Sequence, residues 1–76
     1  MPKLHIFKPK ELLRALLRMG FHIHHQRGSH VHLRHSMKPH LRVTIPFHAR
    51  FDLPTEVTLS ILRQAELSKK DLDILL

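Results

Sequence analysis

The 76-residue sequence contains no cysteine, so it can form neither a disulfide framework nor a thiolate metal site. It also lacks a long apolar run. No stretch could span a bilayer, and the opening segment MPKLHIFKPK has no signal-peptide core. We therefore expect a cytoplasmic protein without a membrane anchor. Repeats, low-complexity tracts and linkers are missing too, which predicts one domain over residues 1–76, with residues 1–8 as an N-terminal extension.

Acidic residues are scarce in the first two thirds of the chain. Residues 1–50 contain ten Lys and Arg and one acid, Glu11, which gives a net charge of +9. Residues 51–76 contain three basic and five acidic residues, which gives −2, and the whole chain carries +7. A basic body of this kind favours binding to a polyanion, with nucleic acid as the first candidate. The alternative is a basic surface that keeps the protein soluble or meets an acidic protein partner.

The spacing of apolar residues predicts two longer helices and a short one. Leucines recur at helical spacing in residues 9–19, where Pro9 suits the first turn and Gly20 suits the end. A second helix emerges within residues 54–67, and a capping pattern begins a short C-terminal helix over residues 68–76. The polar face of the first helix is either solvated or an outer RNA-binding stripe, and its basic residues are Lys10, Arg14 and Arg18.

Three strands are predicted between the two longer helices. Residues 21–26, 30–35 and 41–45 alternate apolar and polar side chains, and the link QRGS at 26–29 predicts a hairpin. The order α-β-β-β-α predicts an α+β fold, in which both helices cover one face of a three-stranded antiparallel sheet. Side chains expected to face the helices are Phe21, Ile23, Val31, Leu33, Val43 and Ile45. Those expected on the open face are His22, His24, His30, His32, Arg34, Arg42 and Thr44.

The nine histidines raise the question of a metal site. Pairs of histidines at i and i+2 on neighbouring strands can present imidazoles to Zn²⁺. The sequence has no CxxC, HExxH or dense carboxylate cluster, and no histidine lies beside an acid that could orient it. We therefore expect no metal and no other cofactor, and a histidine-based metal carrier remains an alternative.

Histidine is also suited to cutting RNA. A base can take the proton of a ribose 2′-hydroxyl, which then attacks the adjacent phosphate and leaves a 2′,3′-cyclic phosphate. The ordinary histidine pKa of about 6.5 keeps the base form available at neutral pH, and nearby cations would stabilise the developing charge. His30 meets this description because it follows a glycine-containing turn. Basic residues close to it in the sequence are Arg27, Arg34 and Lys38. The alternative is an exposed strand histidine without a catalytic role.

Four short motifs occur in a characteristic order. They are Gly20-Phe21 after the leucine-rich helix, RGSH at 27–30, VTIPFH at 43–48 and TLSILRQA at 58–65. With these motifs the chain resembles the HicA family of toxins, which are small mRNA interferases of toxin–antitoxin pairs. The resemblance covers about residues 9–76. It does not explain the surplus of histidine.

The resemblance implies a double-stranded-RNA-binding-domain-like fold and an endoribonuclease without a known metal, neutralised by a cognate HicB antitoxin that covers its basic surface. The catalytic histidine of the Gly-Ser-His motif corresponds to His30, and His48 is a secondary candidate. Protonation of the leaving group also needs an acid, which His32, His48 or water would supply. The residues expected to hold RNA are Arg27, Ser29, Arg34, Lys38 and Arg42, with the stripe Lys10, Arg14 and Arg18. The main rival is a non-catalytic RNA-binding module of the same fold.

Overall fold

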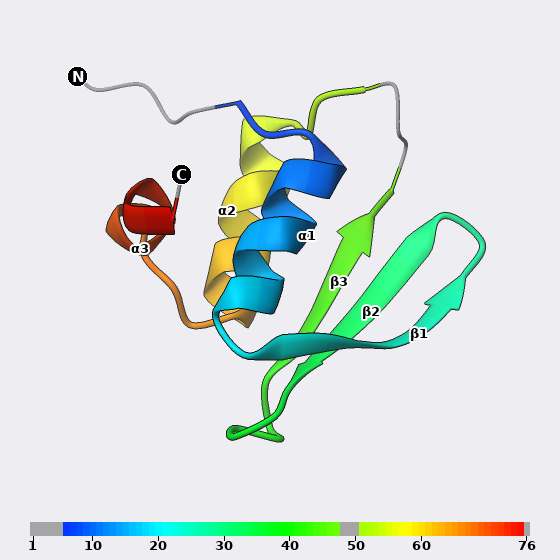
Figure 1. Ribbon diagram of the computed structural model, residues 1–76. Coiled ribbons are helices and arrows are strands. Elements are labelled where there is room, and N and C mark those ends of the chain that lie inside the picture. The colour runs from blue at the N-terminus through cyan, green and yellow to red at the C-terminus, as the bar shows by residue number, and fades with distance from the viewer. Residues whose placement is uncertain (1–5, 48–50, 76) are drawn as a thin grey trace.

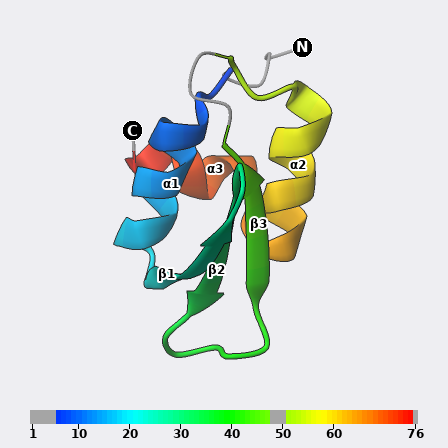
Figure 2. The same cartoon turned by 90° about the vertical axis from the view of Figure 1, so that its right-hand side faces the viewer.

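The computed structural model of the protein describes residues 6–47 and 51–75, without the side chains of residues 74 and 75. The elements within these residues are α1 (Pro9–Arg18), β1 (Phe21–Arg27), β2 (His30–His35), β3 (Arg42–Pro46), α2 (Thr55–Gln64) and α3 (Lys69–Leu75). The strands form an antiparallel sheet in the order β1-β2-β3. Both α1 and α2 lie on one face of this sheet (Figures 1 and 2). The predicted double-stranded-RNA-binding-domain-like α+β fold is confirmed.

The first helix, α1, begins with a proline, whose missing N–H needs no partner there. The Glu11 carboxylate accepts a hydrogen bond from the Lys8 backbone N–H at 2.9 Å, which satisfies one group ahead of the helix. Leu12 and Leu16 are completely buried against the sheet. Leu17, which shares their helical spacing, is 43% exposed. The apolar stripe of α1 is therefore narrower than its run of leucines indicates.

A two-residue turn at Gly28 and Ser29 joins β1 to β2, which confirms the predicted hairpin. Gly28 has a φ of 59°, and a positive φ at the first turn residue is typical of the tight turns that match strand twist. On the other side of β2, His30 is paired with Pro46 and Arg34 with Arg42.

The core lies between the sheet and the helices. The strands contribute Phe21, Val31, Leu33, Val43 and Ile45, each at most 4% exposed. The helices and the connecting segments contribute Phe7, Leu12, Ala15, Leu16, Leu41, Leu53, Ile61, Leu62, Ala65 and Leu72. The predicted inward-facing strand residues are thus confirmed except for Ile23, which is 48% exposed.

A β-bulge in β1 breaks the expected alternation. Ile23 is paired with Leu33 and His25 with His32, so that His24 is left between two ladder pairs. An extra residue of this kind shifts the alternation by one, and His25 therefore comes to the same face as His32. The strict alternation, which left His25 off the open face, is wrong for the second half of β1. All of β1 after its first residue is exposed. Most of these side chains lie on the open face, and Ile23 and Gln26 are exposed because the strand runs beyond the helices (Figure 1).

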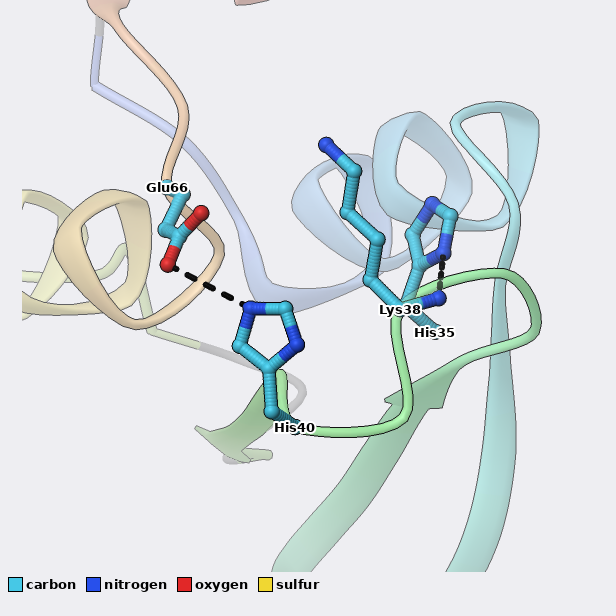
Figure 3. Close-up of polar contacts among 4 residues, drawn as sticks. All are labelled: His35, Lys38, His40 and Glu66. Carbon is cyan, nitrogen blue, oxygen red and sulfur yellow. Dashed lines mark hydrogen bonds and ion pairs between the residues drawn. The ribbon is translucent and has the colours of Figure 1, made fainter.

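The second helix ends at Gln64, before the end of the apolar pattern, because Glu66 adopts a left-handed φ of 56°. The Glu66 carboxylate pairs with His40 Nε2 at 3.6 Å (Figure 3). The predicted cap of α3 is confirmed. The Ser68 N–H donates to Asp71 Oδ2 at 2.8 Å, and the Asp71 N–H donates to Ser68 Oγ at 3.3 Å.

His35, the last residue of β2, ties the end of α1 to the β2–β3 loop. Its Nε2–H donates to the Met19 carbonyl oxygen at 2.8 Å. Its Nδ1 accepts hydrogen bonds from the backbone N–H of Met37 at 3.0 Å and from that of Lys38 at 3.1 Å. Figure 3 shows the bond with Lys38. The ring also meets Phe21 edge-on, with a centroid distance of 4.8 Å. One imidazole thus satisfies three backbone groups, and its role is structural.

We predict that Gly20→Ala is more costly than Gly28→Ala. Gly20 has a φ of 98°, and a Cβ there would lie 2.9 Å from His35 Nε2. Strain and displacement of the ring should together lower the free energy of unfolding by about 2–4 kcal/mol. Gly28 also has a positive φ, but a Cβ there meets nothing within 4 Å, so its loss should be about 1–2 kcal/mol. Urea unfolding measures both. Equal losses would show that the His35 ring gives way without cost.

Candidate functional site

The open face of the sheet collects the histidines and arginines of the strands. Its side chains, here called the basic face, are those of His22, His24, His25, Arg27, His30, His32, Arg34, Arg42 and Thr44. None of the three strands contains an acidic residue. The positive charge of this face is therefore not neutralised within the sheet itself, and the face suits a polyanion.

His30 is exposed at the start of β2, directly after the hairpin turn. It is paired with Arg27 of β1 on one side and with Pro46 of β3 on the other. The Phe47 N–H donates to the Ser29 carbonyl oxygen, so the pairing of β2 with β3 continues past His30. The backbone of His30 is thus fixed on both sides, while its imidazole stays accessible.

Three imidazoles form a cluster next to His30. The rings of His25 and His32 are stacked, with centroids 4.3 Å apart and planes 17° from parallel. His24 meets His25 edge-on at 5.0 Å, and their Nδ1 atoms share a hydrogen bond of 2.8 Å. One of these two nitrogens must donate and the other accept, so both rings cannot be imidazolium while the bond exists. The cluster therefore favours neutral rings.

The surroundings lower the pKa of two histidines in this cluster. For His24 the main cause is the charge of Arg34, followed by loss of solvent and by His25. For His32 the main cause is loss of solvent, followed by the charges of His25 and His30. Both pKa values lie below the ordinary histidine value, so these rings are neutral at neutral pH and able to accept a proton.

A shallow hollow of about 140 Å³ lies on the basic face. The imidazoles of the cluster line it together with the guanidinium groups of Arg34 and Arg42. Arginine presents a planar fork of donors that matches a phosphate group, and imidazole rings offer flat surfaces for a base. The hollow is thus suited in size and charge to part of a nucleotide.

Thr44 connects this cluster to α2. Its Oγ1 lies 3.1 Å from His32 Nδ1 and shares a hydrogen bond with it. Its backbone N–H, on the outer edge of β3, donates to Gln64 Oε1 at 3.0 Å. The Gln64 Nε2 in turn donates to Ser60 Oγ at 3.2 Å. A continuous series of hydrogen bonds therefore relates the position of the His32 ring to the second helix.

The residues predicted to hold RNA do not all lie together. Arg27, Arg34 and Arg42 share the basic face with His30, and Ser29 lies in the turn before it. Lys38 lies in the β2–β3 loop, at the opposite end of β2 from His30 (Figure 1). The stripe Lys10, Arg14 and Arg18 is exposed on α1, in the helix layer on the other side of the sheet (Figure 2). His48, the secondary catalytic candidate, lies outside the described residues.

Two residues of this site were not among the predicted catalytic or RNA-binding residues. His25 reaches the basic face through the bulge, for which the sequence gives no clear signal. Gln64 belongs to the TLSILRQA motif, but its bond to the edge of β3 depends on the packing of α2. Gln64 is exposed beside the buried side of that helix, and its position in the sequence does not show that it reaches the edge of β3.

Within residues 6–47 and 51–75, no group of three or more His, Cys, Asp or Glu side chains is placed to hold a metal ion. None of the described helices has the length and apolar character needed to cross a bilayer. The rings of the histidine cluster meet each other through stacking and a hydrogen bond.

We predict that the fold loses stability as the pH falls below about 6.5. The folded pKa values of His24 and His32 are lowered, so the unfolded chain binds more protons below that pH and is favoured by acid. The urea concentration at the unfolding midpoint should be lower at pH 5.5 than at pH 7.5. The fall should be smaller in the variant His24→Asn/His32→Asn than in the control His40→Asn. An equal fall in both variants would contradict this assignment.

One of the comparisons with known proteins identifies a family for this chain. No curated protein sequence matches the chain. A family model described as "HicA toxin of bacterial toxin-antitoxin" matches residues 9–67. The matched residues run from the start of α1 through the sheet and α2, and they include the whole basic face and the Ser60–Gln64–Thr44–His32 series of hydrogen bonds. The chain therefore belongs to the HicA toxin family of bacterial toxin–antitoxin systems.

Proposed function

We propose that this toxin is an endoribonuclease, an mRNA interferase that cuts RNA in the cytoplasm by metal-independent acid–base catalysis at His30. The observation that carries the proposal is an accessible histidine, fixed between two strands, on a basic face whose strands contain no acid. A nuclease of this kind needs a proton-transfer group held beside cations that receive the phosphate, and His30 with Arg27 provides both.

The proposed reaction needs two proton transfers. The ribose 2′-hydroxyl loses a proton as its oxygen attacks the phosphorus, and the bond from phosphorus to the 5′-oxygen breaks as that oxygen gains a proton. The products are a 2′,3′-cyclic phosphate and a 5′-hydroxyl end. His30 carries out one of these transfers. The guanidinium group of Arg27, which is paired with His30, stabilises the phosphorane-like transition state. Arg34 and Arg42, which are paired at the other end of β2, hold neighbouring phosphates of the RNA backbone.

We also propose that a cognate HicB-type antitoxin neutralises the toxin by covering His30 and the basic face. The net charge of the chain and the absence of acidic residues from its strands support a partner with an acidic surface. Such a partner and RNA would compete for the same arginines. Bound antitoxin would therefore exclude the substrate.

Cleavage of a defined single-stranded RNA in excess EDTA tests the proposal. The purified wild type should release fragments that end in cyclic phosphate, and His30→Ala should lose roughly 10²–10⁴-fold in rate. RNA affinity should hardly change in this variant, because one neutral side chain contributes little to backbone binding. Intact affinity without cleavage by the wild type would instead support the non-catalytic RNA-binding module. Full activity in His30→Ala would show that another residue is the catalyst.

The salt dependence of RNA binding should identify the surface that holds the phosphates. Removing two phosphate contacts in Arg34→Gln/Arg42→Gln should lower the slope of log K against log salt by about 1.4, because each single-strand contact contributes about 0.7. The double variant Lys10→Gln/Arg14→Gln removes the same charge from α1. Its slope should stay close to that of the wild type if RNA lies on the basic face. A larger change of slope in the Lys10→Gln/Arg14→Gln variant than in the Arg34→Gln/Arg42→Gln variant would place the RNA on the helix layer.

A further inference from the structure

A single catalytic histidine leaves one proton transfer of the proposed reaction without a residue. If His30 accepts or donates one proton, a second group must handle the other at the opposite oxygen of the same phosphate. The three strands offer no carboxylate for this purpose. Apart from water and His48, which lies outside the described residues, the groups that can supply it are the imidazoles of the basic face.

His32 has the required relation to His30. The two residues are separated by one residue on β2, so their side chains point to the same face with Cα atoms about 7 Å apart. Side chains at this spacing can reach opposite sides of one phosphate group placed over the strand. His30 also contributes to the lowered pKa of His32, which places the two rings within electrostatic reach of each other.

The ring of His32 is more firmly held than an ordinary surface histidine. Its Nδ1 is hydrogen-bonded to Thr44 Oγ1 at 3.1 Å, and its face is stacked on His25 at 4.3 Å. The backbone of Thr44 is itself fixed through its N–H bond to Gln64. These contacts use one nitrogen and one face of the imidazole. They leave Nε2 available to contact a substrate. Proton transfer requires a ring that is held in position in this way.

We infer that His32 is the second proton-transfer residue of this toxin, acting through Nε2 on the same phosphate as His30, and that Thr44 is its positioning residue. The inference rests on the proposed nuclease function. When Nδ1–H donates to Thr44 Oγ1, Nε2 carries the lone pair that accepts the proton of the 2′-hydroxyl. His30 then donates a proton to the departing 5′-oxygen. One proton is taken up and one released, so the two histidines end with exchanged protonation states.

The electrostatics of the basic face support this division. Loss of solvent and the neighbouring positive groups keep His32 in its neutral form, which is the form that accepts a proton. The titratable and charged groups that face it are His24, His25 and Arg27 of β1, His30 and Arg34 of β2, and Arg42 of β3. None of these groups is acidic. The more exposed His30 is left to act as the proton donor.

An RNA whose scissile 5′-oxygen is replaced by sulfur separates the two roles. A thiolate leaves without a proton, so a variant that lacks the acid recovers on this substrate and a variant that lacks the base does not. On ordinary RNA, His30→Ala and His32→Ala should each lose roughly 10²–10⁴-fold in kcat. On the sulfur substrate, His30→Ala should recover to within about tenfold of the wild type, while His32→Ala stays slow. Recovery of His32→Ala alone would also support the pair, with the roles exchanged.

Two outcomes would overturn the inference. Full activity of His32→Ala on ordinary RNA, with His30→Ala inactive, would leave His30 as a catalyst without this partner. Failure of both variants to recover on the sulfur substrate would show that neither is the acid. The control His40→Ala removes an exposed histidine outside the basic face and should keep the wild-type rate. Absence of cleavage in the wild type itself would overturn the proposed nuclease function, and this outcome is distinct from the others.

The Thr44 assignment has its own test. Thr44→Val keeps the shape of the side chain but removes the hydroxyl, so kcat should fall by about tenfold to a hundredfold with little change in KM. The pH–rate profile should also shift, because His32 loses the hydrogen bond to Thr44 that keeps its proton on Nδ1. Thr44→Ser restores a hydroxyl and should recover most of the rate. An unchanged rate and pH profile in Thr44→Val, with Tm equal to that of the wild type, would exclude a positioning role.

Discussion

One face of the sheet is buried beneath α1 and α2, and this burial fixes which side chains remain available to a partner. Val31, Leu33, Val43 and Ile45 are at most 3% exposed. Full burial of each contributes about 1.5–3 kcal/mol, and the four together about 6–12 kcal/mol. A small domain has a total stability of about 5–15 kcal/mol, so a one-residue slip of β2 or β3 would unfold the protein. The core therefore also determines the composition of the basic face, because each inward position places a polar neighbour outward.

Burial beneath the helices does not fix the side chains of β1 after its first residue. Phe21 is buried, but Ile23 is 48% exposed and the rest of the strand lies beyond the helices. A bulge at His24 therefore costs little apolar burial there, whereas the same bulge in β2 would expose the core. Its consequence is chemical. It adds His25 to the basic face, where the ring stacks on His32 and bonds to His24. The histidine cluster forms because this edge strand can contain a bulge without exposing the core.

The sequence was sufficient to predict the features that depend on local periodicity. The alternation in β2 and β3, the hairpin turn at Gly28 and the cap of α3 all follow from neighbouring residues, and the structure has each of them. Features that join distant segments could not be predicted in this way. His35 contacts Met19 across 16 positions, and Gln64 contacts Thr44 across 20. Neither pair shows a pattern, because each depends on how two elements pack. The proposed catalyst His30 came from a motif, whereas the surroundings of His32 required the fold.

RNA on the basic face would change the protonation of the histidines that line it. In the free protein, positive charge and loss of solvent lower the pKa values of His24 and His32. A phosphate beside these rings supplies the negative charge that the strands lack, and it raises both pKa values. Binding would then take up protons, and by linkage the affinity for RNA would rise as the pH falls. Acid would thus weaken the free fold while it strengthens a complex with RNA. Membership of the HicA family does not explain the surplus of histidine. That surplus would give this particular chain both effects of acid, the lower stability of the free fold and the higher affinity for RNA.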